Sequence, residues 1–156
     1  MSAQAGPAVV LGIGNELLGD DGAGVAVVRE LGRLVEQGDV RLPEGTTLLD
    51  GGTLGLGLLP WVADARTLII VDAAELGRPP GSVAVLAGDD HLTGELPAAV
   101  RTAGAMPGVI AIVAVQPGAL APGIGLSDAV RSAIPTVVAA VLRTVGSVAA
   151  EAGTTT

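Results

Sequence analysis

Short runs of aliphatic, β-branched residues alternate along this chain with segments of helical periodicity, and that alternation constrains the fold most. The runs are Val9–Ile13, Thr46–Asp50, Thr67–Asp72, Ser82–Leu86 and Val109–Val115. Nearly uninterrupted apolar strands are typical of a sheet that is buried on both faces. Helical segments between strands act as crossover connections, which make neighbouring strands parallel. We therefore predict an α/β fold, a single-domain three-layer sandwich whose mostly parallel, twisted sheet of about five strands is flanked by helices.

Helices are predicted where apolar residues recur every three to four positions. The segments are about Ala23–Val35, Leu54–Val62, Leu92–Thr102 and Asp128–Val148. Gly38 fits the end of the first helix, and Ser127 is a suitable N-cap for the last. One domain is expected to span residues 1–156, with residues 1–7 and 149–156 as flexible tails.

Composition excludes several classes of protein. The chain has no cysteine, so disulfides, thiolate nucleophiles and zinc–cysteine clusters are excluded. It has no lysine, and its net charge is −8, so it lacks the basic surface that nucleic acids or anionic membranes require. Mean hydropathy is high at +0.63, but the apolar run Val109–Val115 is far shorter than the roughly 20 residues of a membrane-spanning helix. We expect a cytoplasmic protein without membrane insertion, whose partner is a cation or a basic surface.

Acidic residues follow three of the predicted strands. Asp20 and Asp21 come after the first strand, Asp50 after the second and Asp72 after the third. Ligand sites of parallel sheets form beyond the C-terminal ends of the strands, so these acids are expected to converge. One of the adjacent pair is expected to cap the following helix, with Asp20 favoured for that role. Asp72 has an alternative interpretation as a turn acid without a catalytic role.

The glycines of the loop Gly14–Gly22 have spacings that suggest phosphate binding. However, Asp20 and Asp21 occupy the positions where a P-loop carries Lys and Ser or Thr. Repulsion between a phosphate and these partly desolvated acids costs on the order of 1 kcal/mol or more. A nucleotide-binding domain is therefore the weakest hypothesis. Paired carboxylates, one acting as base and the other as acid, are the favoured chemistry.

The only histidine, His91, follows Asp89 and Asp90. It is either a metal ligand or a surface residue in a solvated run of charges. A Ser–His–Asp triad is disfavoured because no serine has the sequence context of a nucleophile elbow. The sequence also lacks the HExxH and EF-hand patterns.

Six motifs in a fixed order resemble those of the hydrogenase maturation endopeptidases. They are Gly12–Gly24, Asp50–Gly55, Ile69–Ala73, Pro80–Ser82, Val115–Pro117 and Ile124–Ser127, and the resemblance spans about residues 8–145. The resemblance implies an endopeptidase that removes the C-terminal extension from the large-subunit precursor of a nickel–iron hydrogenase. It also implies that cleavage follows insertion of nickel into that precursor.

The resemblance further implies roles for individual residues. Asp21 and Asp72 match the acids that are catalytic and contact nickel, and His91 is the candidate for the histidine that contacts the same metal. Nickel is carried by the substrate, and no organic cofactor is expected. Substrate contacts are expected from five residues, Asn15, Asp20, Gly51, Gly52 and Thr53. The protein is expected to act as a monomer, as an aspartic-type or metal-dependent hydrolase.

The chain departs from the family between Asp72 and His91. Only residues 73–90 separate the two, whereas the family has a longer segment there, followed by a substantial helix. The alternative hypothesis is therefore a catalytically impaired binding module or chaperone of the same fold that acts on a hydrogenase subunit.

Overall fold

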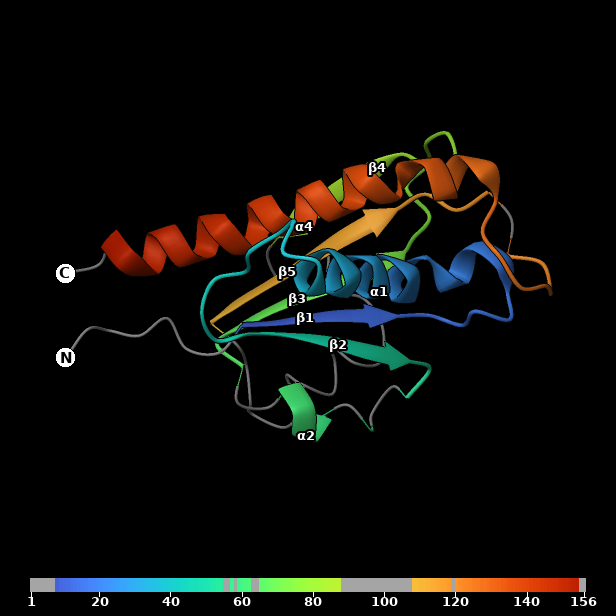
Figure 1. Ribbon diagram of the computed structural model, residues 1–156. Helices are drawn as coiled ribbons and strands as arrows, with labels where there is room; N and C mark the ends of the chain where they lie inside the picture. The colour runs from blue at the N-terminus through green and yellow to red at the C-terminus, as the bar shows by residue number, and fades with distance from the viewer. Residues whose placement is uncertain are drawn as a thin grey trace.

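A computed structural model describes residues 8–54, 57, 59–62, 65–87, 108–118 and 120–154. Within these residues the chain forms one five-stranded sheet in the order β2-β1-β3-β5-β4 (Figure 1). The strands are β1 (Ala8–Ile13), β2 (Thr46–Gly52), β3 (Thr67–Ala73), β4 (Val83–Ala87) and β5 (Val109–Val115). All five predicted strands are confirmed, each with ends within two residues of the prediction.

The order of the strands defines where a ligand can approach the sheet. β1 is parallel to both β2 and β3, so that Gly12 lies between Asp50 on one side and Val71 on the other. β5 is parallel to β3, and β4 is an antiparallel edge strand. From β1 the chain continues to β2 on one side of β1, and from β2 it crosses to β3 on the opposite side of β1. The C-terminal ends of β1 and β3 therefore flank a topological switch point, where such sheets bind ligands.

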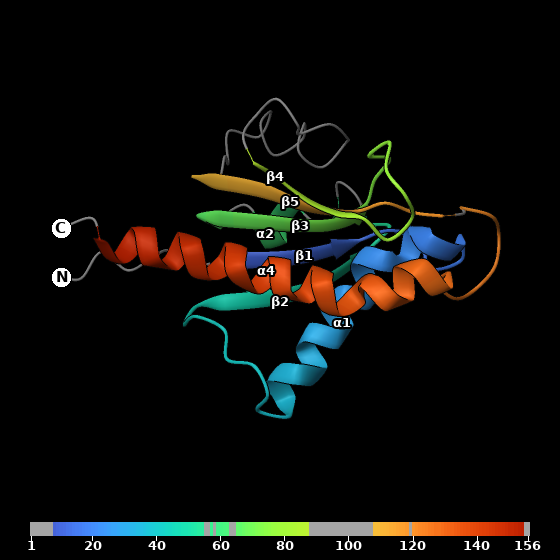
Figure 2. The same cartoon turned by 90° about the horizontal axis from the view of Figure 1, so that it is seen from above.

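Helices cover both faces of the sheet, which confirms the predicted three layers. On one face lie α1 (Ala23–Glu36), which follows the 3₁₀ turn η1 (Gly19–Gly22), and the long helix α4 (Asp128–Thr154) (Figures 1 and 2). The short helix α2 (Leu59–Val62) lies on the other face (Figure 1).

Alternating strand residues form two aliphatic cores, because successive side chains point to opposite faces of a sheet. The larger core joins α1 and α4 to Val10, Ile69, Val71, Val113 and Val115. The smaller core joins Val62 and Ala65 to Val9, Leu11, Leu68, Ile70 and Ile110.

Two predicted helices differ from those observed. α4 continues to Thr154, beyond the predicted end at Val148, and the predicted flexibility of residues 149–156 remains a prediction. The added turns include three alanines, which are the strongest helix formers. Of the predicted helix Leu54–Val62, the described residues show α2 over Leu59–Val62 and no helix at Leu54, next to glycines that each disfavour a helix by about 1 kcal/mol. The predicted helix over 92–102 and the predicted tail at 1–7 lie outside the described residues.

α4 is also, among the described helices, the one long and apolar enough to cross a membrane by composition. Its segment Asp128–Ser147 has a mean hydropathy of 1.3. In the structure Val130, Val137 and Val141 are fully buried in the larger core. Packing against the sheet accounts for this composition, since the core helix of a folded domain has the same character.

Candidate functional site

Glycines allow η1 and α1 to sit directly on the C-terminal ends of the central strands. A Cβ atom on Gly24 would lie 2.1 Å from the carbonyl oxygen of Val71 and 2.5 Å from that of Ile13. A Cβ atom on Gly14, whose φ is +135°, would lie 1.9 Å from the carbonyl oxygen of Asp21. This close approach places Asp21, in η1, over the ends of β1 and β3.

Asp72 lies near the end of β3 and is electrostatically coupled to Asp21. Burial and, to a lesser extent, the negative charge of Asp21 together raise the pKa of Asp72 from its usual 3.8 to about 7. A hydrogen bond from the backbone of Ala73 opposes both effects on this pKa. The structure therefore brings together the two acids that the sequence singled out.

Replacing Asp72 with Asn is expected to stabilise the fold at neutral and alkaline pH. Because the folded-state pKa is raised to about 7, folding favours the protonated form. The contribution of the Asp72 carboxyl to the free energy of unfolding is therefore fully present below about pH 4, and it is lost as pH rises through about 7. The variant's advantage in unfolding free energy should therefore grow by about 2 kcal/mol between about pH 5.5 and pH 8 and then level off. Urea unfolding at several pH values measures this advantage.

The exposed acid Asp128 provides the control for that titration. Its side chain is 103% exposed and pairs with Arg131 at 3.5 Å. The difference between Asp128→Asn and the unsubstituted protein should not grow over the same pH range, because exposed pairs contribute little. Equal behaviour of the two variants would contradict the coupling of Asp72 to its surroundings.

Asn15 shapes the loop that carries Asp21. Its backbone N–H donates to Oδ2 of Asp21 at 2.9 Å, and its side-chain Oδ1 accepts from the N–H of Leu17 at 2.9 Å. The first contact orients the carboxylate, and the second closes the turn before η1. The structure thus gives Asn15 a positioning role beside Asp21, and the predicted substrate contact remains a prediction.

Asp20 has a structural role that is distinct from the helix cap and the substrate contact that the sequence suggested. It is 1% exposed, and it accepts hydrogen bonds from the N–H of Gly118 at 2.8 Å and from the N–H and hydroxyl of Ser127, both at 2.7 Å. No side chain caps α1, whose N-cap is Gly22. The prediction that Asp20 caps the following helix is therefore wrong, because its carboxylate is bound to another loop. Its predicted contact with substrate remains a prediction.

Ser127 is confirmed as the N-cap of α4. Its hydroxyl oxygen accepts from the N–H of Val130 at 3.4 Å while the hydroxyl donates to Asp20. Asp20 therefore ties the loop after β1 to the start of α4, over a separation of more than a hundred residues.

The turn Gly51–Thr53 lies beside the Asp21 loop at the end of β2. The N–H of Gly14 donates to the carbonyl oxygen of Gly52 at 2.9 Å, and Thr53 is exposed. Its neighbour Asp50 does not join the Asp21–Asp72 pair as the sequence suggested. The Asp50 carboxylate instead pairs with Arg29 at 3.1 Å, and the same guanidinium contacts Glu16.

His91 lies outside the described residues, so its predicted contact with metal remains a prediction. Among the described residues, no group of three or more His, Asp or Glu side chains is arranged to hold a metal ion. The described part of the site is therefore a pair of carboxylates, which needs further ligands from elsewhere to complete a metal site.

Gln116 is a structural contributor that sequence reasoning placed in a motif without assigning a role. It is 4% exposed at the end of β5. Its side-chain oxygen accepts from the N–H of Leu76 at 2.6 Å, and its amide nitrogen donates to Glu75 at 3.0 Å. Gln116 thereby holds the segment that leaves β3 just after Asp72. In the sequence, the position of this amide side chain directly after a fully apolar strand could have indicated a structural role for Gln116.

The sequence of this chain is similar to those of several known proteins. Residues 25–144 match the family model described as "Hydrogenase maturation protease". The chain is 35% identical over 140 residues to the Hydrogenase 2 maturation protease of Escherichia coli, covering 81% of this chain and 82% of that protein. It is 43% identical over 82 residues to the hydrogenase expression/formation protein HupD of Rhodobacter capsulatus, covering 53% of this chain and 37% of that protein.

Similarity extends to solved structures. The hydrogenase maturating endopeptidase HybD of E. coli superimposes with a TM-score of 0.78 at 30% identity, covering 90% of this chain and 93% of that chain. The chain spans 37%, 58% and 44% of the length of three curated hydrogenase expression/formation proteins that it matches.

Proposed function

Because this chain belongs to the hydrogenase maturation protease family, we propose that it is an endopeptidase that removes the C-terminal extension of a nickel–iron hydrogenase large-subunit precursor. The coupled pair Asp21 and Asp72 at the switch point of the sheet carries this proposal. The pair occupies the position where a ligand of an open α/β sheet binds.

The chemistry of the pair suits a substrate that presents a cation. Burial and the charge of Asp21 both disfavour the ionised form of Asp72, and a cation bound beside this carboxylate would offset both effects. In the proposal that cation is the nickel of the precursor, which belongs to the substrate and accepts oxygen ligands. Nickel contact would favour the ionised form of Asp72, so recognition of a loaded precursor is coupled to release of a proton.

Hydrolysis requires a group that exchanges protons near neutral pH. A pKa of about 7 gives Asp72 both protonation states under these conditions, as a general acid or base requires. The turn Gly51–Thr53 borders the Asp21 loop, and we propose that its exposed edge contacts the precursor. In this proposal His91 supplies a further contact to nickel.

Cleavage of a purified precursor tests this function. The full chain, incubated with nickel-loaded precursor, should release a C-terminal peptide detectable by mass spectrometry. Asp21→Asn and Asp72→Asn should each lower the rate of cleavage by about a hundredfold or more, because each removes a positioned carboxylate. Asp128→Asn should leave the rate unchanged, since that side chain is fully exposed. Cleavage that survives the simultaneous replacement of Asp21 and Asp72 would contradict their assigned roles.

A second candidate function is a binding module or chaperone of the same fold. The short connection between Asp72 and His91 favours it, because it departs from the family pattern. A stable complex with the precursor, without loss of mass at any nickel concentration, would support this candidate. Observed cleavage would eliminate it.

A further inference from the structure

Three large aliphatic side chains are exposed on two loops, one of which carries Asp21. Leu17 is 62% exposed, Leu120 is 53% exposed and Ile124 is 86% exposed. Leu17 belongs to the loop that carries Asp21, whereas Leu120 and Ile124 belong to the connection between β5 and α4. We call these three side chains the apolar corner.

Backbone pairing joins the two loops of the apolar corner. Leu18 and Gly123 form a parallel β-bridge, in which the N–H of Gly19 donates to Gly123 at 2.9 Å and the N–H of Gly123 donates to Leu17 at 2.9 Å. Leu17 and Ile124 therefore flank the same bridge. Beside it lies a hollow of about 270 Å³, lined by Gly19, Asp20 and residues 121–127.

The loops that carry these exposed side chains are held in place by hydrogen bonds. The buried carboxylate of Asp20 accepts hydrogen bonds from Gly118 and Ser127, which bracket the second loop. A loop held in this way cannot fold its apolar side chains inward without breaking hydrogen bonds to a buried charge. Preorganised apolar side chains are the form that interaction surfaces take, because little ordering entropy is lost on binding.

The apolar corner is continuous with the candidate site. Leu17 is four residues from Asp21, so their Cα atoms are at most about 14 Å apart. A protein that brings a metal ion to Asp21 would therefore be bound within about 14 Å of Leu17. Glu16, the acid next to Leu17, is partly exposed and is paired with Arg29, so the corner presents an apolar surface to its partner.

We propose that the apolar corner is a docking surface for the hydrogenase large-subunit precursor, which would bury an apolar segment against Leu17, Leu120 and Ile124. This inference rests on the proposed function. It assigns the corner to binding of the precursor body, separately from the chemistry at Asp21 and Asp72. Loss of the corner should then raise KM and leave kcat at saturating precursor unchanged.

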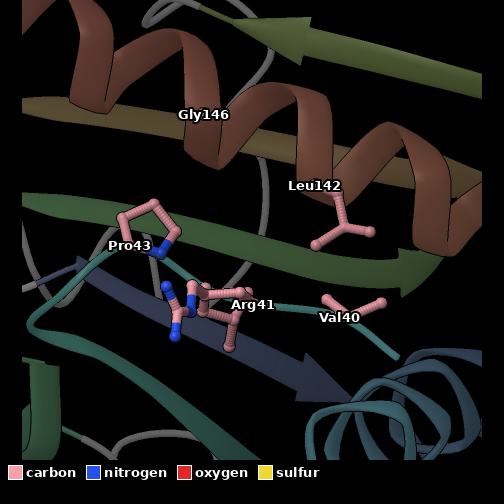
Figure 3. A pocket seen from close by; sticks show the side chains of 6 residues that line it. Val40, Arg41, Pro43, Leu142 and Gly146 are labelled. Atoms are coloured by element: carbon pink, nitrogen blue, oxygen red, sulfur yellow. The ribbon is translucent and has the colours of Figure 1, made fainter. Parts of the chain in front are cut away.

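Another groove among the described residues is a less suitable docking surface for this substrate. It is lined by Val40, Arg41, Leu42, Pro43, Leu142 and Gly146, between the segment before β2 and the C-terminal half of α4 (Figure 3). Those residues flank the N-terminal end of β2 and the far part of α4, whereas Asp21 and Asp72 lie at the C-terminal ends of the strands. A partner confined to that groove would not reach the carboxylate pair.

The test uses the neutral variants Ile124→Gln and Leu120→Gln, singly and together. Binding of the full chain to purified nickel-loaded precursor is measured by biolayer interferometry, and cleavage is measured in parallel. The double variant should raise Kd by about tenfold or more, as expected for the loss of two buried aliphatic side chains. Its thermal unfolding should match that of the unsubstituted protein, because both side chains are exposed in the free chain.

Val85→Gln is the matched control. Val85 is an aliphatic side chain of comparable exposure, 47%, on the edge strand β4. Its replacement should leave Kd and KM unchanged. An unchanged Kd in the double variant, or equal weakening by Val85→Gln, would overturn the docking surface.

These outcomes are distinguishable from failure of the proposed function. If the unsubstituted chain cleaves the precursor and the double variant binds and cleaves equally well, the docking surface is wrong and the function stands. If the unsubstituted chain binds without cleaving and the double variant binds more weakly, the surface stands and the endopeptidase function is wrong. If the unsubstituted chain does not bind the precursor, both are wrong.

Discussion

Replacing Gly24 with Ala is expected to destabilise the protein by about 3 kcal/mol, the upper part of the range for overpacking a rigid core. The added Cβ would lie 2.1 Å from the carbonyl oxygen of Val71 and 2.5 Å from that of Ile13. Both obstacles are backbone atoms of paired strands, so relief requires α1 to move away from the sheet. Because η1 precedes α1 directly, the same movement would displace Asp21 from Asp72, and precursor cleavage should fall as well.

Gly32→Ala is the control for this substitution on the same helix. The nearest atom to its added Cβ would be Cδ1 of Leu48 at 3.9 Å, an ordinary contact. Ala is favoured over Gly in helices by about 1 kcal/mol, so this variant should be neutral or stabilised. Urea unfolding monitored by circular dichroism measures both effects. Equal unfolding midpoints for the two variants would show that the close approach at Gly24 does not constrain the fold.

Replacing Asp20 with Ala is expected to cost about 2–3 kcal/mol of unfolding free energy. The substitution removes the acceptor for two backbone N–H groups and one hydroxyl, at a side chain that is 1% exposed. Those donors belong to the exposed Gly118 and the partly buried Ser127, and each would lose this partner. Asp20→Asn should cost less, because the amide keeps one oxygen acceptor.

Asp128→Ala tests whether acidity alone explains the effect of Asp20→Ala. Asp128 is also an acid near the start of α4, but its side chain is fully exposed. Its loss should change the unfolding free energy by less than about 1 kcal/mol. Thermal and urea unfolding of both variants provide the comparison. A cost for Asp20→Ala no larger than that for Asp128→Ala would contradict the structural role of Asp20.

The strands were predictable from sequence because each is a short apolar run that contains β-branched residues. The short helix α2 and the extension of α4 were predicted less well. Helix ends depend on small differences in propensity that packing can outweigh. Thus Leu54 forms a turn with Gly51 at the start of a segment predicted as helix, and alanines carry α4 to Thr154.

The candidate site was predictable in its central pair. Asp21 and Asp72 follow adjacent parallel strands, so topology alone brings them to one edge of the sheet. The roles of the residues around them were not predictable, because each depends on a partner distant in the chain. Asp20 is bound to Ser127, and Asp50 is bound to Arg29.

The sequence by itself determined the α/β architecture, the family and the two acids at the strand ends. The periodicity, the acidic residues at the strand ends and the ordered set of motifs are local properties of the chain. They can be identified without knowledge of its tertiary contacts. Only the tertiary structure decided three further properties of the protein. They are the burial of Asp20, the raised pKa of Asp72 and the exposure of particular aliphatic side chains. Those outcomes depend on solvent exclusion and on contacts across a hundred residues, which spacing along the chain does not encode.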